Sequence, residues 1–143
     1  MSTFANQGST STTNLAQAFQ AQCHVTNNSP DWYVDSGATS HMKSNSASLD
    51  STSYASTDHV IFINGNSFSI SHIGTKTLSL AIKISDVLVI PNITKNLLSI
   101  SKLTHDAPLD VLFSNPFSVI QNRVTKEILA RGKCENGLYV LKQ

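Results

Sequence analysis

The sequence has 143 residues, enough for one domain, and 40% of them are hydrophobic, as in a globular protein. Charged residues make up only 13% and the net charge is +1 at pH 7, which predicts no partnership with nucleic acid or an anionic membrane. No secretory signal pattern opens the chain and no apolar run could span a bilayer, so we expect an intracellular protein.

Residues 1–29 are rich in Ser, Thr, Asn and Gln and contain few large apolar side chains. Because such a segment buries too little surface to offset its ordering entropy, we predict a flexible tail or linker, with a short helix over residues 14–22. A cleavage junction and a strand at a dimer interface are the alternatives. Cys23 and Cys134 are far apart and are expected to be free thiols, and neither they nor the histidines have the spacing of a zinc site.

From Asp31 onward, apolar and polar residues alternate with a period of two, which predicts strands. Asn64-Gly65 is a strong hairpin signal between strands over 59–63 and 67–71. In the strand predicted over 77–85, alternation places Leu78, Leu80, Ile82 and Ile84 inward. The run Val87–Ile90 is apolar on both faces, so we expect a strand that is covered on both sides.

The second half of the chain continues this pattern after one short helix, in which Ser99 caps one or two turns towards Thr104. Four more strands are predicted, separated by turns at 115–116, 122–126 and 136–137, and they cover residues 109–113, 117–121, 127–131 and 138–141. Many short strands at near-even spacing predict an all-β fold that is a closed or nearly closed β-barrel over residues 30–143.

The segment Trp32–Ala38 contains the most informative pattern in the chain. A hydrophobic strand leads into Asp35, and Ser36-Gly37 follow as a turn. A carboxylate directly after a buried strand is costly unless something uses or satisfies it. The serine hydroxyl can hydrogen-bond its neighbours, and glycine lets other atoms approach the carboxylate. We therefore predict that Asp35, Ser36 and Gly37 form the catalytic turn of an aspartic protease, although the tripeptide alone is also an ordinary turn.

Hydrolysis of a peptide by carboxylates needs two of them close together, sharing one proton. The coupling of such a dyad is a standard example of perturbed carboxyl pKa values. The chain has one Asp-Ser-Gly turn and is too short for a two-lobed enzyme. Two copies related by a two-fold axis would bring the two Asp35 side chains together. The sequence thus predicts a homodimer acting on an extended polypeptide, without a metal or organic cofactor.

Three segments resemble the Pol polyproteins of copia-type retrotransposons. Residues 32–42 are similar to the protease motif, 87–103 to the second signature, and 137–141 to the segment that borders the pre-integrase region. The resemblance implies a retropepsin-like barrel whose flap is the hairpin around Val60–Ile73. It places the protein in the cytoplasm, including virus-like particles.

The resemblance also implies roles for single residues. Asp35 would activate water, and the residue matching Ser36 binds across the dimer axis in retropepsins. Leu97–Ser99 matches a hydrophobic-hydrophobic-glycine element with serine in the glycine position. Substrate would contact Ala38 beside the catalytic turn and Asn64 and Gly65 in the flap.

Several chemically capable residues have plainer interpretations. We expect His41 to be a structural or surface histidine and not a proton shuttle, and Asp31 to be a solvated turn residue and not a second acid. Asp86 is expected in a turn or paired with Lys83 or Lys95. An alternative to the enzyme is a non-catalytic barrel that acts as a dimerisation or peptide-binding module. A third possibility is a protein that needs neighbouring polyprotein sequence to dimerise.

Overall fold

The computed structural model describes residues 29–55, 59–61 and 65–143. Its elements are β1 (Trp32–Asp35), β2 (Met42–Lys43), β3 (Ser51–Tyr54), β4 (His59–Ile61), β5 (Ser67–Ser69), β6 (His72–Ser79), β7 (Ile82–Val89), β8 (Asn96–Ser99), α2 (Ile100–Asp106), β9 (Leu109–Ser114), β10 (Phe117–Asn122), β11 (Ile128–Glu135) and β12 (Leu138–Leu141). This part of the chain is mostly strand, as predicted. The predicted tail up to residue 28 and its helix lie outside the described residues. Within those residues, no helix has the length and apolar character needed to cross a membrane.

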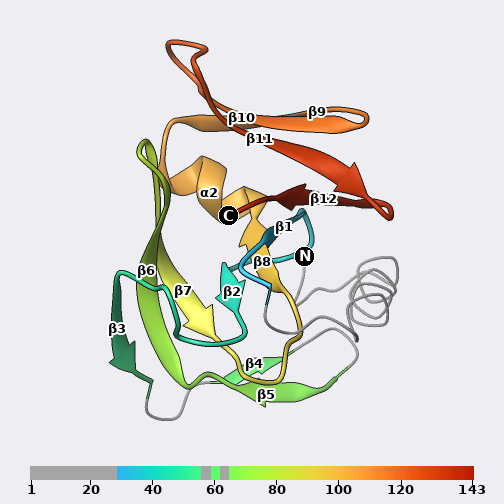
Figure 1. Ribbon diagram of the computed structural model, residues 1–143. Helices are drawn as coiled ribbons and strands as arrows, with labels where there is room; N and C mark the ends of the chain where they lie inside the picture. The colour runs from blue at the N-terminus through green and yellow to red at the C-terminus, as the bar shows by residue number, and fades with distance from the viewer. Residues whose placement is uncertain (1–28, 56–58, 62–64) are drawn as a thin grey trace.

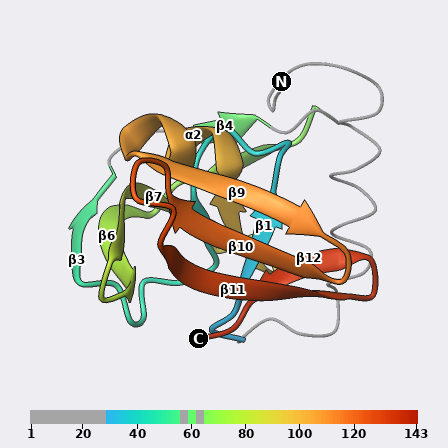
Figure 2. The same cartoon turned by 90° about the horizontal axis from the view of Figure 1, so that it is seen from above.

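Ten strands form one curved sheet in the order β3-β6-β7-β2-β8-β1-β12-β11-β10-β9, and β4 pairs with β5 as a separate hairpin. The ends of the sheet, β3 and β9, are not paired with each other in the described part of the chain, so the prediction of a closed barrel is wrong. Helix α2 lies between the layer of β9–β11 and the layer of β6 and β7 (Figure 1). Seen from above, β9, β10 and β11 run side by side across one face, with β3 and β6 to one side (Figure 2).

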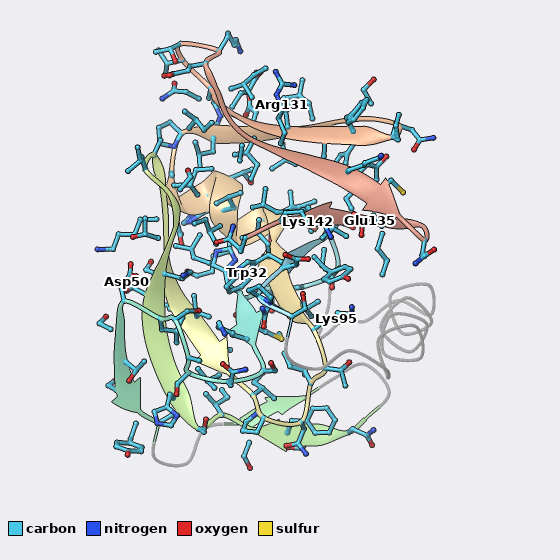
Figure 3. All side chains as sticks on the ribbon, viewed as in Figure 1. Trp32, Asp50, Lys95, Arg131, Glu135 and Lys142 are labelled. Carbon is cyan, nitrogen blue, oxygen red and sulfur yellow. The ribbon has the colours of Figure 1, made fainter. Side chains whose placement is uncertain are left out.

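The side chains of β1 and β8 pack into two cores, one on each face of the sheet, because successive side chains of a strand point to opposite sides. On one face, Trp32 and Leu98 pack into a core with Leu103 of α2. Trp32 lies near the middle of the molecule (Figure 3). On the other face, Leu97 belongs to a second core, against which Tyr33 packs. The sheet therefore holds β1 firmly from both sides.

Strand β8 lies between β1 and β2, the two strands that flank the loop over residues 36–41. It runs parallel to β1, with Trp32 opposite Asn96 and Asp35 opposite Ser99. It runs antiparallel to β2, where Met42 is opposite Leu97. The chain thus leaves the sheet after Asp35, passes over the end of β8 and returns as β2, which fixes both ends of the loop.

Two of the predicted strand patterns have different outcomes. The strand over Val87–Ile90 is confirmed, since β7 extends to Val89 and Val87, Val89 and Ile90 are buried. The single strand over 77–85 is wrong, because the chain turns at Leu80 and Ala81 and joins β6 to β7. Leu80 is fully exposed and does not face the core. No Gly or Pro marks this turn, and the alternation continues through it in sequence.

The predicted hairpin around Asn64-Gly65 is confirmed where the structure describes it. Val60 pairs with Phe68 and Ile61 with Ser67. The turns at 115–116, 122–126 and 136–137 also separate strands as predicted, although β11 continues to Glu135, beyond the predicted end at residue 131.

Gly132 in β11 is expected to tolerate no side chain. A Cβ at this position would lie 2.5 Å from Ser118 Oγ and 2.8 Å from the Val140 carbonyl oxygen. Gly132→Ala should therefore lower the free energy of unfolding by about 1–3 kcal/mol, the usual cost of overpacking, as measured by urea denaturation. Adding Ser118→Ala removes one of the two clashes and should restore part of the loss. Equal stability of Gly132→Ala and the parent chain would contradict this packing.

Candidate active site

Asp35 is the last residue of β1, in the middle of the sheet. Its Oδ1 accepts a hydrogen bond of 2.7 Å from the Gly37 N–H, which closes the turn on the carboxylate. Because alternate residues of a strand share a face, Asp35 lies on the same face of the sheet as Tyr33. This is the face on which Phe68 of the hairpin packs. The carboxylate is thus rigidly placed at the edge of the second core.

Burial sets the acidity of this carboxyl. It raises the pKa of Asp35 above the ordinary value, because a charged carboxylate loses hydration. The N–H groups of Gly37 and Ala38 donate to the carboxylate and lower the pKa, but their effect is smaller. The Asp35 carboxyl therefore holds its proton more tightly than the carboxyl of an exposed aspartate does.

The other residues predicted for the catalytic turn differ in exposure. Ser36 is exposed, Gly37 is half-buried and Ala38 is buried. The turn therefore presents Ser36 outward while Ala38 anchors the loop in the protein. Ala38 is 2% exposed, so its side chain offers little contact to a ligand in the single chain.

Ser99 supports the loop from below. Its Oγ donates a 2.7 Å hydrogen bond to the Ala38 carbonyl and accepts one of 3.1 Å from the Lys102 N–H. The second bond makes Ser99 the N-cap of α2, as predicted. Leu97 and Leu98, which precede it, are buried. One hydroxyl thus joins the start of the helix to the loop that follows Asp35.

We expected His41 to be a structural or a surface histidine. It is buried, so the structural alternative is confirmed. It is 1% exposed, and its Nδ1 accepts a 3.0 Å hydrogen bond from the Ser99 N–H. The ring is therefore neutral, with its proton on Nε2. Burial, and next the positive charge of Lys102, lower the pKa of His41 to about 4, while Asp106 acts in the opposite direction.

This histidine makes stability depend on pH. The unfolded chain binds the His41 proton at an ordinary pKa of 6.5, whereas the folded chain binds it only near pH 4. The contribution is therefore complete above pH 6.5 and is lost as the pH falls towards 4. We expect a loss of about 3 kcal/mol in the free energy of unfolding, measured by urea denaturation at several pH values. His41→Asn, which keeps an acceptor but does not titrate, should have the flatter profile. Matching profiles would contradict this assignment.

The residues predicted in the flap are only partly described. Asn64 lies outside the described residues. Gly65 is exposed and has φ +90°, a left-handed conformation that favours glycine. The contact of Gly65 with substrate stays a prediction.

An open groove of about 600 Å³ borders the loop at Thr39 and Ser40. Charged residues line its other side, where Lys102 Nζ lies 2.7 Å from Asp106 and 3.7 Å from Asp86. The expectation that Asp86 pairs with Lys83 or Lys95 is therefore wrong. Asp86 has φ +52° in a bulge of β7, which a sequence pattern does not indicate. Among the described residues, no three His, Cys, Asp or Glu side chains gather as a metal site would require.

Two buried polar residues near β1, Lys95 and Asn96, make hydrogen bonds that were not predicted. Lys95 Nζ donates a 2.7 Å hydrogen bond to Tyr33 Oη. The buried Asn96 donates to the carbonyl oxygens of Ser29 and Asp31 and accepts from the Ser44 N–H. The only signal in the sequence is a polar pair directly before the apolar Leu-Leu. These contacts fix the start of β1.

Asp31 does not contribute a second acid. Its carboxylate lies 3.3 Å from Lys142 Nζ, which also contacts Glu135 at 3.3 Å. Figure 3 places Lys142 and Glu135 close together near the C-terminal strand. The Asp31 side chain is mostly buried in this ion pair. The prediction of a solvated turn residue is therefore wrong, and Asp31 has a structural role.

Comparisons with known proteins show the family to which the chain is similar. The model of the family described as "Pol polyprotein, beta-barrel domain" matches residues 32–107. The chain is 32% identical over 143 residues to the retrovirus-related Pol polyprotein from transposon RE2 of Arabidopsis thaliana, covering 90% of this chain and 10% of the relative. It is 34% identical over 116 residues to that from transposon RE1, covering 78% and 8%. The chain thus spans a tenth or less of these relatives, and no solved structure matches it significantly.

Proposed function

Because this chain belongs to the Pol polyprotein β-barrel domain family and is a region of a copia-type retrotransposon Pol polyprotein, we propose that it is an aspartic endopeptidase that cleaves the polyprotein. It acts as a homodimer with one Asp35 from each subunit. One observation carries the proposal. The Asp35 carboxylate ends a central strand, is capped at 2.7 Å by the Gly37 N–H, and has a pKa raised by burial.

The chemistry needs two such carboxylates that share one proton. The ionised carboxylate takes a proton from water, and the water oxygen attacks the carbonyl carbon of the peptide. The protonated carboxyl donates a hydrogen bond to the carbonyl oxygen and stabilises the charge that develops there. A carboxyl that already holds its proton more tightly than usual suits this sharing.

The surface around the turn supports the homodimer. Ser36 is exposed directly beside the half-buried Asp35, so a second copy can reach both residues. Two-fold symmetry would place Ser36 and Asp35 of each subunit at the axis. Gly37 keeps the approach to the carboxylate open because it has no side chain.

The substrate is an extended polypeptide that runs between the turn and the β4–β5 hairpin. It adds main-chain hydrogen bonds as an extra strand would, passing beside the backbone at Ala38, whose side chain is buried, and along Asn64 and Gly65 of the hairpin. We propose no metal or organic cofactor and an intracellular site of action, in the cytoplasm and in virus-like particles.

Cleavage as a function of pH and concentration tests the proposal. A peptide library incubated with the purified chain should be cut with a bell-shaped pH profile, because one carboxyl must be ionised and the other protonated. The specific activity should rise with protein concentration in step with the dimer fraction from analytical ultracentrifugation. An Asp35→Asn chain purified in parallel serves as the control for contaminating proteases.

Two results would overturn the proposal. Cleavage by a strictly monomeric chain would exclude the shared dyad. A stable dimer that cuts no peptide from acidic to neutral pH would favour a dimerisation or peptide-binding module.

A further inference from the structure

Two buried hydrogen bonds connect His41 to the catalytic turn through Ser99. The imidazole Nδ1 accepts from the Ser99 N–H at 3.0 Å, and the Ser99 Oγ donates to the Ala38 carbonyl at 2.7 Å. Ser99 is 0% exposed and His41 1%, so water cannot replace either partner without opening the core. Ala38 follows Gly37 directly, and Ser99 lies opposite Asp35 in the sheet.

We propose that His41 is a positioning residue, whose neutral ring orients Ser99 so that the Ser99 hydroxyl holds the Asp35–Gly37 turn in its active geometry. This inference rests on the proposed protease function. The acceptor is essential because Ser99 presents an N–H to the ring. A protonated ring would place a second donor against that N–H, and the two would repel. The turn would then lose its support from below.

Burial and the charges around the ring together set the pH at which His41 takes up a proton. Lys83 of β7 lines a small cavity of about 90 Å³ beside His41, and Asp106 of α2 lines the same cavity. Lys102 of α2 opposes protonation and Asp106 favours it, but burial dominates and the pKa of His41 is lowered to about 4. The hydrogen bonds are therefore intact at neutral and mildly acidic pH and open only in stronger acid.

A comparison of His41→Asn and His41→Leu tests the proposal by cleavage. Asparagine can offer its Oδ1 where histidine offers Nδ1, whereas leucine offers no acceptor. At about pH 6, well above the folded pKa of His41, His41→Asn should keep cleavage near the parent level, and His41→Leu should lose about 10- to 100-fold in kcat, as expected for a misplaced catalytic group. Equal kcat for His41→Leu and the parent chain would overturn the proposal.

An NMR titration of the full chain carrying Asp35→Asn separates the proposal from the protease function. This background removes the titration of Asp35 itself and needs no catalysis. The His41 ring should carry its proton on Nε2 at neutral pH, and the Ser99 and Gly37 amide signals should shift with the ring as it titrates at about 4. A ring midpoint at the ordinary value of 6.5, or amides that ignore the ring, would overturn the positioning role even if His41→Leu fails to fold. If the parent chain cuts nothing but the amides follow the ring, only the protease function fails.

Discussion

Replacement of the Asp35 carboxylate should abolish cleavage. Asp35→Asn is expected to lower kcat by about 10³-fold or more, because neither subunit of the dimer can then take a proton from water. The amide oxygen can still accept from the Gly37 N–H, which bonds Oδ1 at 2.7 Å in the parent chain, so the turn should keep its shape. The measurement is the initial rate on a cleaved library peptide at the pH optimum.

Asp31→Asn is the matched control, with the same change four residues earlier. Asp31 forms an ion pair with Lys142 and lies outside the turn, so its loss should leave the rate within about twofold. Because burial raises the Asp35 pKa, Asp35→Asn should be at least as stable as the parent chain at neutral pH. An active Asp35→Asn chain would eliminate the aspartic mechanism.

Removal of the Trp32 side chain should be the most destabilising single change. Trp32 of β1 is 0% exposed and packs in the core together with Leu98 of β8 and Leu103 of α2. Trp32→Ala should lower the free energy of unfolding by about 4 kcal/mol, since it removes the packing of a large ring and leaves a cavity. Domains of this size are stable by only about 5–15 kcal/mol, so the variant should unfold at much lower urea concentration.

The control is Trp32→Phe, which keeps most of the apolar volume. It should cost less than half as much as Trp32→Ala, and its urea dependence should keep the parent slope. Similar losses for Phe and Ala would mean that the site depends on the indole itself and not on filled volume.

Local sequence signals predicted the elements that carry the site. The apolar run into Asp35, the Ser99 cap and the Asn64-Gly65 hairpin each depend on a few neighbouring residues, so a single sequence contains their cause. The strand that begins at Val87 could also be predicted, because a strand buried on both faces has no alternation of polar and apolar residues.

The features that the sequence did not predict depend on distant residues. The turn at Leu80 lacks turn residues, and the left-handed Asp86 is held beside Lys102 of a helix later in the chain. The open ends of the sheet at β3 and β9 depend on which distant strands pair, and strand periodicity does not encode this pairing. The role of His41 depends on a backbone N–H that is 58 positions away.

Both strands that pair with β1 lie much later in the chain, so β1 must wait for their synthesis before it can pair. Trp32 is paired on one side with the strand at Asn96 and on the other with the strand at Leu141. Such distant partners are found slowly, and the last of them leaves the ribosome long after the first. The pairing of β1 is therefore completed only after the chain has been synthesised through Leu141.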